Sequence, residues 1–319
     1  MNRRNFLSAT AAAALVTLGP RAGAAQSALP SEIRIGYQKS GPLLITKQDR
    51  LLEKKFGDRA VAVKWLEFPF GPPLLEALNT GNIDYGATGD TPPIFAQAAR
   101  AKLLYVAANP GRGDTQAIVV PPDSPLQNIR DLKGKKVGIA KASSAHDLAV
   151  AAVESAGLAF TDIVPVYLAP ADAAVAFARG AIDAWSIWDP FLAIAEITRN
   201  ARRLPIDPAT ASQNSFYLAN RDFVGKYPHV VAIINAAVAD ASSWAKDHRE
   251  EAAQIFSDAT GVDLAAQRRT VLRTDFMFSP MTPPIITQQQ AVADRFRRLG
   301  LIPSPVRVSD IVWTWTPSA

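Results

Sequence analysis

Two acidic residues lie at equivalent places in two similar stretches and raise the question of acid–base chemistry. Asp90 lies in residues 79–92, NTGNIDYGATGDTP, and Asp189 in residues 179–190, RGAIDAWSIWDP. Two carboxylates flanking a cleft are the arrangement of glycoside hydrolases. Asp189 precedes Pro190, and Asp90 lies beside Thr91, which precedes Pro92. Both groups therefore fit a helix N-cap followed by an early proline. We therefore expect both residues to cap helices and position a ligand rather than to catalyse a reaction.

Residues 141–146, KASSAH, have the features of an anion site. They follow an apolar strand pattern and open a helical one, so free backbone N–H groups and the positive end of the helix dipole favour an anion there. Ser143 and Ser144 add hydroxyl donors. The alternative is simple N-capping, in which Ser144 bonds back to the helix. One serine would suffice for a cap, so we favour anion contact.

The other candidate ligand contacts lie at the ends of further predicted strands, because ligands of open α/β sheets bind outside the carboxyl ends of the strands. They are Gln38, Lys39, Ser40, Gly89, Thr91, His146 and Trp188.

Three of these candidates have a competing structural interpretation. Trp185 and Trp188 lie on opposite sides of one strand, so one is expected in the core and the other in the cleft wall. His146 fits a hydrogen-bonded structural histidine as well as a ligand contact. Lys39 fits either an anion contact or a solvated rim residue.

Repeated strand ends predict how these residues are positioned. Gly81 and Asp84 match Gly180 and Asp183, and a Gly-x-x-Lys strand end occurs at 36–39 and again at 138–141. Strands alternate with helices, which indicates right-handed βαβ units and mostly parallel sheets. We expect two α/β lobes around a cleft, with lobe one at 31–115 and 222–319 and lobe two at 116–221.

The composition and the missing motifs exclude several classes of enzyme. The chain has 319 residues, of which 48% are hydrophobic and 20% charged, as in ordinary globular proteins. It contains no cysteine, which excludes disulfides and cysteine chemistry. It has no Gly-x-Ser-x-Gly, His-Glu-x-x-His, Walker or Gly-x-Gly-x-x-Gly motif, so we expect no catalytic residue, cofactor or metal.

Residues 1–24 read as an export signal. A basic start precedes a short apolar run and an Ala-x-Ala site, and Arg3-Arg4-x-Phe6-Leu7 resembles a twin-arginine signal. Removing this segment lowers the net charge from +5 to +2, because it holds three arginines and no acid. The mature charge lacks the strong basic excess that nucleic-acid binding requires.

Motifs at the strand ends resemble those of aliphatic sulfonate-binding proteins, within the wider family that also binds taurine, nitrate and thiamine-pyrimidine precursors. The matching segments are RIGYQK at 34–39, GDTPPIFAQ at 89–97, DLKG at 131–134, the Ser143-Ser144 turn with His146, AWSIWDP at 184–190 and SFYL at 215–218.

The resemblance implies a type II periplasmic binding protein fold and a monomer that hands a small organic anion to an ABC permease at the inner membrane. Gln38, the Gly89–Thr91 turn and the two serines would hold a sulfonate, with Trp188 beside its tail. Ala142 and Ser40 replace glycines common in the family, and Ala142 would reshape the anion corner if that glycine adopts φ > 0. Nitrate, taurine or an alkyl sulfate, and an exported pyrimidine synthase or hydrolase, are the alternatives.

Overall fold

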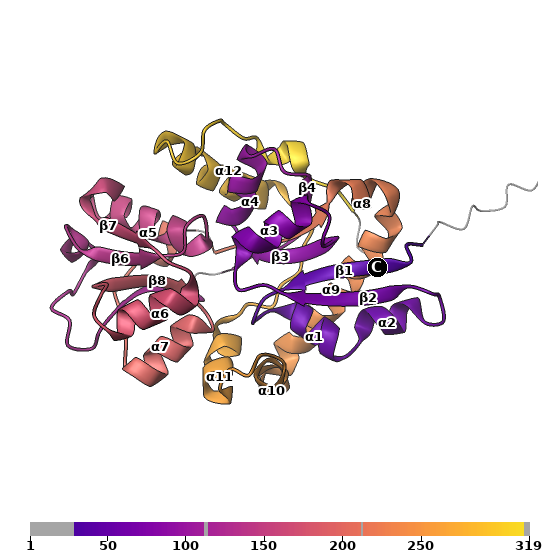
Figure 1. The fold of residues 1–319 in the computed structure, drawn as a ribbon, viewed down its shortest axis with the longest axis horizontal. Coiled ribbons are helices and arrows are strands. Elements are labelled where there is room, and N and C mark those ends of the chain that lie inside the picture. The colour runs from indigo at the N-terminus through magenta and orange to yellow at the C-terminus, as the bar shows by residue number, and fades with distance from the viewer. Residues whose placement is uncertain (1–28, 112–113, 212, 316–319) are drawn as a thin grey trace, which may run out of the picture.

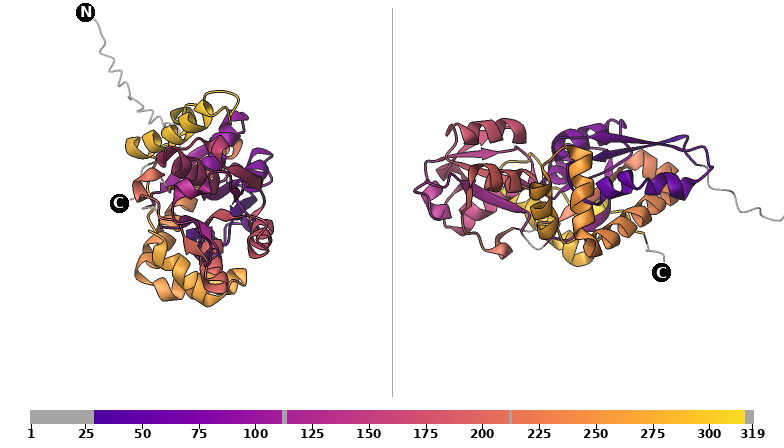
Figure 2. Two further views of the ribbon diagram at one scale, coloured as in Figure 1. Left: turned by 90° about the vertical axis from the view of Figure 1, so that its left-hand side faces the viewer. Right: turned by 90° about the horizontal axis from the view of Figure 1, so that it is seen from below.

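The protein consists of two α/β lobes lying end to end (Figures 1 and 2). The computed structural model describes residues 29–111, 114–211 and 213–315; the predicted export signal at 1–24 lies outside these ranges. The view from below places most of the C-terminal helices against the first lobe (Figure 2).

The first sheet has the strand order β2-β1-β3-β10-β4. Its strands are β1 (Glu32–Tyr37), β2 (Ala62–Glu67), β3 (Tyr85–Gly89), β4 (Leu103–Asn109) and β10 (Ser215–Asn220). Side chains of β10 alternate between two cores, with Phe216 and Leu218 on one face and Tyr217 and Ala219 on the other. Both faces of this sheet are therefore covered.

The second sheet repeats this layout in the order β7-β6-β8-β5-β9. Its strands are β5 (Gln116–Val120), β6 (Lys136–Ile139), β7 (Val164–Tyr167), β8 (Ala184–Trp188) and β9 (Arg202–Arg203). Ile118 and Val120 face one core, whereas Ala117 and Val119 face the other. In each sheet four strands run in the same direction, as predicted, and one strand, β10 or β5, runs antiparallel to its neighbours, so the sheets are mixed.

Helices cover both faces of each sheet. In the first lobe, α1, α2 and α9 lie on one side and α3, α4 and α12 on the other, whereas α5 lies opposite α6 and α7 in the second lobe (Figure 1). The α-helices are α1 (Pro42–Gln48), α2 (Leu51–Phe56), α3 (Gly71–Asn79), α4 (Thr91–Ala98), α5 (Ser144–Ser155), α6 (Pro170–Ala178), α7 (Phe191–Arg199), α8 (Arg221–Lys226), α9 (Pro228–Asp247), α10 (Arg249–Thr260), α11 (Leu264–Arg273) and α12 (Pro283–Arg298). Short 3₁₀ turns are η1 (Ile129–Leu132), η2 (Phe160–Asp162), η3 (Pro208–Thr210) and η4 (Val308–Ile311). A search of the described residues finds no helix with the length and apolar character needed to cross a bilayer.

The repeated Gly and Asp residues have the same structural role in both lobes. Gly81 and Gly180 follow α3 and α6 with φ of 72° and 68°. This left-handed conformation, which often ends a helix, is free of steric strain only for glycine. The Asp84 carboxylate accepts a hydrogen bond from the Arg34 amide at 2.8 Å. Asp183 repeats this bond with the Lys136 amide at 2.7 Å. Asp84 thus joins the start of β3 to β1, and Asp183 joins the start of β8 to β6.

The chain passes between the lobes twice, from β4 to β5 and from β9 back to β10. The predicted end of lobe two at residue 221 lies too far along the chain, because it assigns strand β10 to the wrong lobe. Residues 215–220 form β10, which pairs with β3 and β4 inside the first sheet. The second sheet itself ends with β9.

Candidate functional site

A cavity of about 160 Å³ lies between the lobes, at the carboxyl ends of several strands. Seven of the predicted ligand contacts line it: Gln38, Ser40, Gly89, Ser143, Ser144, Trp188 and Asp189. The other four candidates, Lys39, Asp90, Thr91 and His146, do not line this cavity. The strand-end rule therefore predicts where this cavity lies but not which neighbouring side chains line it.

Four helices start at the cavity. Leu43 of α1, Gly71 of α3, Pro92 of α4 and Ser144 of α5 all belong to its lining. Helix starts carry partial positive charge and unpaired N–H groups, so their convergence favours an anion. The starts of α3 and α4 offer fewer donors, because each contains two prolines, which lack an N–H.

The start of α5 is the strongest donor site. Within the described ranges, the Ser144 amide and hydroxyl and the Ala145 amide have no hydrogen-bond partner. Ser143 is the N-cap, yet neither serine makes a side-chain capping bond, so the capping alternative is wrong. The Ser143 hydroxyl instead donates to the Ala140 carbonyl at 2.6 Å. Ser144 rather than Ser143 can therefore donate a hydroxyl hydrogen bond to a ligand.

Gln38 and Lys39 follow β1 but face different surroundings. Gln38 Nε2 donates to the Ala87 carbonyl at 2.9 Å, which fixes the amide against β3 at the cavity wall. Lys39 Nζ instead lies 3.7 Å from a Glu67 carboxylate and 3.4 Å from the Thr260 carbonyl. Lys39 therefore behaves as a rim residue tied to neighbouring elements.

Asp90 and Thr91 turn away from the cavity. Asp90 is buried, and its side chain does not cap α4, contrary to the prediction. Its Oδ1 accepts a hydrogen bond from the Thr91 hydroxyl at 2.9 Å. Burial raises the pKa of the Asp90 carboxyl well above its usual range, and the nearby Asp147 carboxyl adds to this rise.

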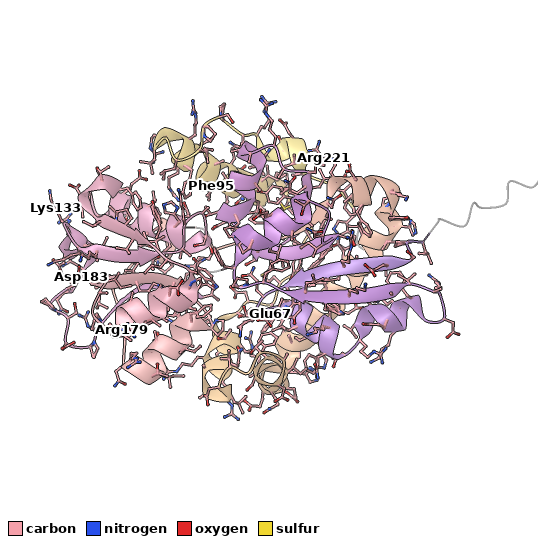
Figure 3. All side chains as sticks on the ribbon, viewed as in Figure 1. Glu67, Phe95, Lys133, Arg179, Asp183 and Arg221 are labelled. Atoms are coloured by element: carbon pink, nitrogen blue, oxygen red, sulfur yellow. The ribbon has the colours of Figure 1, made fainter. Side chains whose placement is uncertain are left out.

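His146 lies in an aromatic contact between the lobes. Its ring lies near Phe95 and Phe296 of the first lobe and near Phe160 of the second, at centroid distances of 5.2 to 6.4 Å. Phe95 is labelled beside α4 in Figure 3. Burial lowers the pKa of His146 to about 4, with Lys141 contributing, so the ring is neutral at physiological pH. Its structural interpretation is therefore favoured.

The two tryptophans of β8 separate as alternation predicts. Trp185 is buried in the second lobe, with its ring 5.9 Å from that of Phe177. Trp188 lines the cavity and contacts Phe191 edge-on at 6.2 Å. Trp188 therefore supplies an aromatic wall next to the polar donors.

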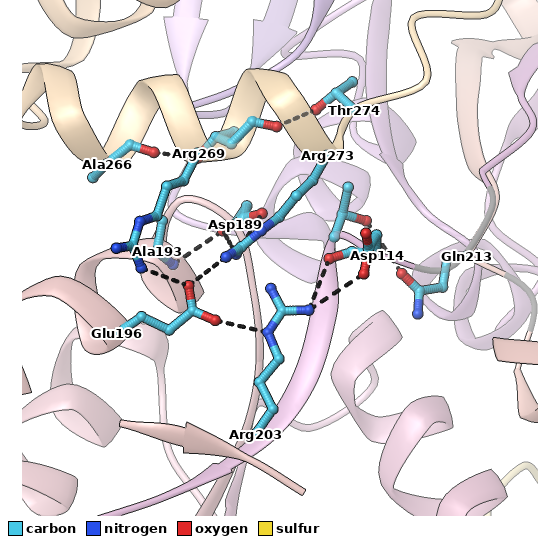
Figure 4. Close-up of polar contacts among 12 residues, drawn as sticks. Asp114, Asp189, Ala193, Glu196, Arg203, Gln213, Ala266, Arg269, Arg273 and Thr274 are labelled. Carbon is cyan, nitrogen blue, oxygen red and sulfur yellow. Dashed lines mark hydrogen bonds and ion pairs between the residues drawn. The ribbon is translucent and has the colours of Figure 1, made fainter. Parts of the chain in front are cut away.

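Asp189 is held by an arginine that the sequence analysis missed. Arg273, the last residue of α11, lines the cavity and places Nη1 at 3.2 Å from Asp189 Oδ1 (Figure 4). It also donates to Glu196 of α7. The Ala193 amide donates to Asp189 at 3.0 Å, so Asp189 contacts the first turn of α7, although Pro190 and not Asp189 is the N-cap of this helix.

Burial dominates the titration of Asp189. It raises the pKa of the Asp189 carboxyl to about 6, although Arg273 opposes the rise. Above this pH the charged pair joins α11 to the end of β8. Only the cluster of arginines in residues 268–273 could have pointed to α11, and it does not indicate which residue reaches the cavity.

Ala142 occupies a left-handed corner just before the serines. Its φ is 60°, so the backbone here adopts the conformation that the family's glycine allows. The Ala142 amide donates to His146 Nδ1 at 3.3 Å, which helps to hold the corner. Ser40 has no positive φ, so its departure from glycine imposes no such strain.

We expect Ala142→Gly to stabilise the protein by about 0.5–1 kcal/mol. Left-handed φ costs a non-glycine residue roughly 1–2 kcal/mol, and the extra freedom of glycine in the unfolded chain returns part of this. Urea unfolding should show the gain. Ala140→Gly, two residues earlier at negative φ, is the control and should destabilise. An Ala142→Gly variant destabilised as much as Ala140→Gly would contradict the assignment of strain.

Two α/β lobes joined by two crossings, with a polar cavity between them, define the class of two-lobed ligand-binding proteins that close around a ligand. The model of the "NMT1/THI5 like" family matches residues 62–252. The chain belongs to this family.

Individual relatives agree with this assignment. The alkanesulfonate-binding protein SsuA from Xanthomonas axonopodis pv. citri, solved bound to MOPS, is 38% identical, with a TM-score of 0.85 over 90% of this chain and 99% of that one. The periplasmic aliphatic sulphonate binding protein SsuA from Escherichia coli is 37% identical, with a TM-score of 0.82 over 91% and 94%. A relative from Escherichia coli (strain K12), described as an aliphatic sulfonates-binding protein, is 38% identical over 95% of both chains. The resemblance and the fold class inferred from the sequence are thereby confirmed.

Proposed function

We propose that this protein is the substrate-binding component of an ABC importer and captures an alkanesulfonate in the cavity between its lobes. The observation that carries the proposal is the start of α5, where Ser144 lines the cavity with donors that have no partner among the described residues. The relatives named for binding sulfonates support the ligand class. MOPS, present in one of those structures, is itself an alkanesulfonate.

The donors at this site suit a sulfonate. A sulfonate remains a monoanion throughout the physiological pH range, and its three oxygens accept several hydrogen bonds. Amide and hydroxyl donors such as those of Ser144 and Gln38 give short charge-assisted bonds to such an anion. Walls that exclude water strengthen each bond. Neutral groups can therefore hold the anion without a lysine in direct contact.

The opposite wall of the cavity would receive the organic tail. Trp188 offers an aromatic surface, and Asp189 beside it is already bound by Arg273 and the Ala193 amide. An aminosulfonate such as taurine would place its ammonium against a carboxylate. Asp189 is engaged by Arg273 and Asp90 lies elsewhere, but Asp114 and Asp275 also line the cavity. A ligand panel must therefore separate taurine from an unsubstituted alkanesulfonate.

Lobe closure would couple ligand capture to delivery. The first lobe contributes Gln38 and Gly89, and the second contributes Ser144 and Trp188. A ligand that contacts both lobes favours the closed arrangement by its difference in affinity for the two states. The closed monomer would then release its ligand to an ABC permease at the inner membrane.

We further propose that the protein works in the periplasm after twin-arginine export, as the residues Arg3 and Arg4 suggest. The hydrolase alternative loses support. Asp90 lies outside the cavity that Asp189 lines, so the two carboxylates do not flank a common space.

A thermal-shift panel tests the proposal with ethanesulfonate, butanesulfonate, taurine, nitrate, sulfate and an alkyl sulfate at equal ionic strength. A ligand at a hundredfold excess over Kd stabilises by about 2.7 kcal/mol, which raises Tm by roughly 5 °C. We expect the alkanesulfonates to give such shifts and nitrate and sulfate to give none. A shift with taurine or nitrate alone would contradict the sulfonate assignment.

A further inference from the structure

Two buried carboxyl groups from different lobes lie next to the proposed anion corner. Asp90 follows Gly89 at the end of β3, and Asp147 lies in the first turn of α5. Their exposed fractions are 1% and 1%. β3 and α5 approach closely here, because a Cβ added at Gly89 would lie 2.7 Å from Ser144 Oγ.

Each carboxyl has one oxygen without a protein partner. Asp90 Oδ2 and Asp147 Oδ2 are both buried and make no hydrogen bond with any described residue. Ionised carboxylates can only accept hydrogen bonds, so burying two of them near enough to repel, as Asp147 does Asp90, is costly without compensation. One proton held by the pair supplies a donor and removes one of the two charges.

Arg295 of α12 provides part of the compensation. Its Nη1 lies 2.6 Å from Asp147 Oδ1, and its charge also acts on Asp90. Glu154, further along α5, lies 3.8 Å from Arg295 Nε and is paired with Arg298. The single positive charge of Arg295 thus acts on Asp147 and Asp90, and Glu154 is close enough to neutralise part of it.

The remaining groups around Asp90 are neutral. Thr91 donates its hydroxyl to Oδ1, and Gln289 of α12 donates to the Asp90 carbonyl at 2.6 Å. The Tyr105 hydroxyl accepts from Gln289 at 2.9 Å, and burial keeps this phenol protonated by raising its pKa. No cation among the described residues forms an ion pair with Asp90, and Arg295 acts on it only through its charge.

We propose that Asp90 and Asp147 are positioning residues that share one proton across the lobe contact and hold Gly89 against Ser144 at the anion corner. Protonated, the group of Asp90, Asp147 and Arg295 carries no net charge. Loss of the proton places an extra negative charge beside the bound anion and weakens the contact between the lobes.

The direction of the pH effect follows from linkage. Burial raises the pKa of both carboxyls above 3.8 in the folded protein, and the charge of Asp147 adds to the rise at Asp90 while that of Glu154 adds to the rise at Asp147. Their contribution to stability is therefore complete below the unfolded value and is lost as pH rises through the folded value. A nearby anion raises these values further, so ligand binding should take up a proton.

The part of this inference that concerns affinity rests on the proposed function, whereas the part that concerns stability does not. The test compares wild type with Asp90→Asn, which keeps the shape of the side chain but cannot ionise. Titration calorimetry with ethanesulfonate is run from pH 6 to 9, in buffers of different ionisation enthalpy. Asp189 also titrates near pH 6 at the cavity. The quantity read is therefore the ratio of wild-type to variant Kd at each pH.

We expect this ratio to rise about tenfold across the range, with proton uptake on binding by wild type that Asp90→Asn lacks. Urea unfolding without ligand should show Asp90→Asn gaining stability over wild type as pH rises. Asp84→Asn, which removes a buried partner of Arg34 far from the cavity, is the control and should leave the pH dependence of Kd unchanged.

A constant ratio of the two Kd values across the pH range, or equal proton uptake by wild type and Asp90→Asn, would overturn the proposal. If no sulfonate binds at all, the proposed function fails, and the unfolding data alone then support or refute the shared proton.

Discussion

Gly89→Ala is expected to weaken sulfonate binding at least about a hundredfold, a loss of roughly 2.7 kcal/mol. The new Cβ would lie 2.7 Å from Ser144 Oγ and 2.9 Å from Ser144 Cβ, closer than real Cβ contacts allow. The Ser144 hydroxyl can rotate away from the new methyl group, but the position of the Ser144 Cβ is fixed by the backbone of α5. The lobes must therefore move apart where both should contact the anion. Titration calorimetry with an alkanesulfonate measures the loss.

Two controls separate this clash from a general effect of the substitution. Gly225→Ala adds the same methyl group in α8, where nothing lies within 4 Å, and should leave Kd unchanged. Ser144→Gly removes both contacting atoms, so adding Gly89→Ala to Ser144→Gly should cost little further affinity. A Gly89→Ala protein that binds within threefold of wild type would contradict the closed geometry of this corner.

Arg273→Leu should destabilise the protein by about 3 kcal/mol at pH 8, because it leaves Asp189 buried without its partner. The side chains of Arg273 and Asp189 are 16% and 3% exposed. At pH 5 the cost should be smaller by roughly 1 kcal/mol, because Asp189, with a pKa of about 6, is then protonated and needs no cation. Urea unfolding at the two pH values measures the difference.

Arg268→Leu is the matched control, since Arg268 pairs with Glu250 at side-chain exposures of 50% and 62%. Exposed pairs contribute little, so this variant should lose less than about 0.5 kcal/mol. Asp189→Asn combined with Arg273→Leu should recover part of the stability. Equal losses in the two arginine variants would show that the Arg273 bridge does not stabilise the closed lobes.

Local sequence was sufficient to predict the paired sheets. The positions of Gly81 and Gly180 require left-handed backbone, and Asp84 and Asp183 each join two strands, so the repeated motif reflects a repeated structure. The boundary near residue 221 was misplaced because strand β10 returns to the first sheet by pairing that depends on distant partners.

Side-chain direction explains most of the errors at the site. Ser144 and His146 are two residues apart in α5, about 200° around the helix, so they face nearly opposite sides. Ser144 therefore reaches the cavity while His146 packs among aromatic rings. This could have been deduced from helix geometry.

Arg273 could not be predicted in the same way. Its bond to Asp189 spans 84 residues and requires α11 to pack against α7 of the other lobe. No local pattern specifies such a contact, because it depends on how the two lobes come together. Asp90 was misassigned for a similar reason, since its surroundings come from α5 and α12.

A crystal structure of the protein with butanesulfonate tests the central claim most directly. The account predicts sulfonate oxygens about 2.7–3.2 Å from the Ser144 amide and hydroxyl and from the Gln38 amide, with the alkyl chain against Trp188. A sulfonate held by Lys39 at the rim, or bound to one lobe without contact to the other, would contradict it.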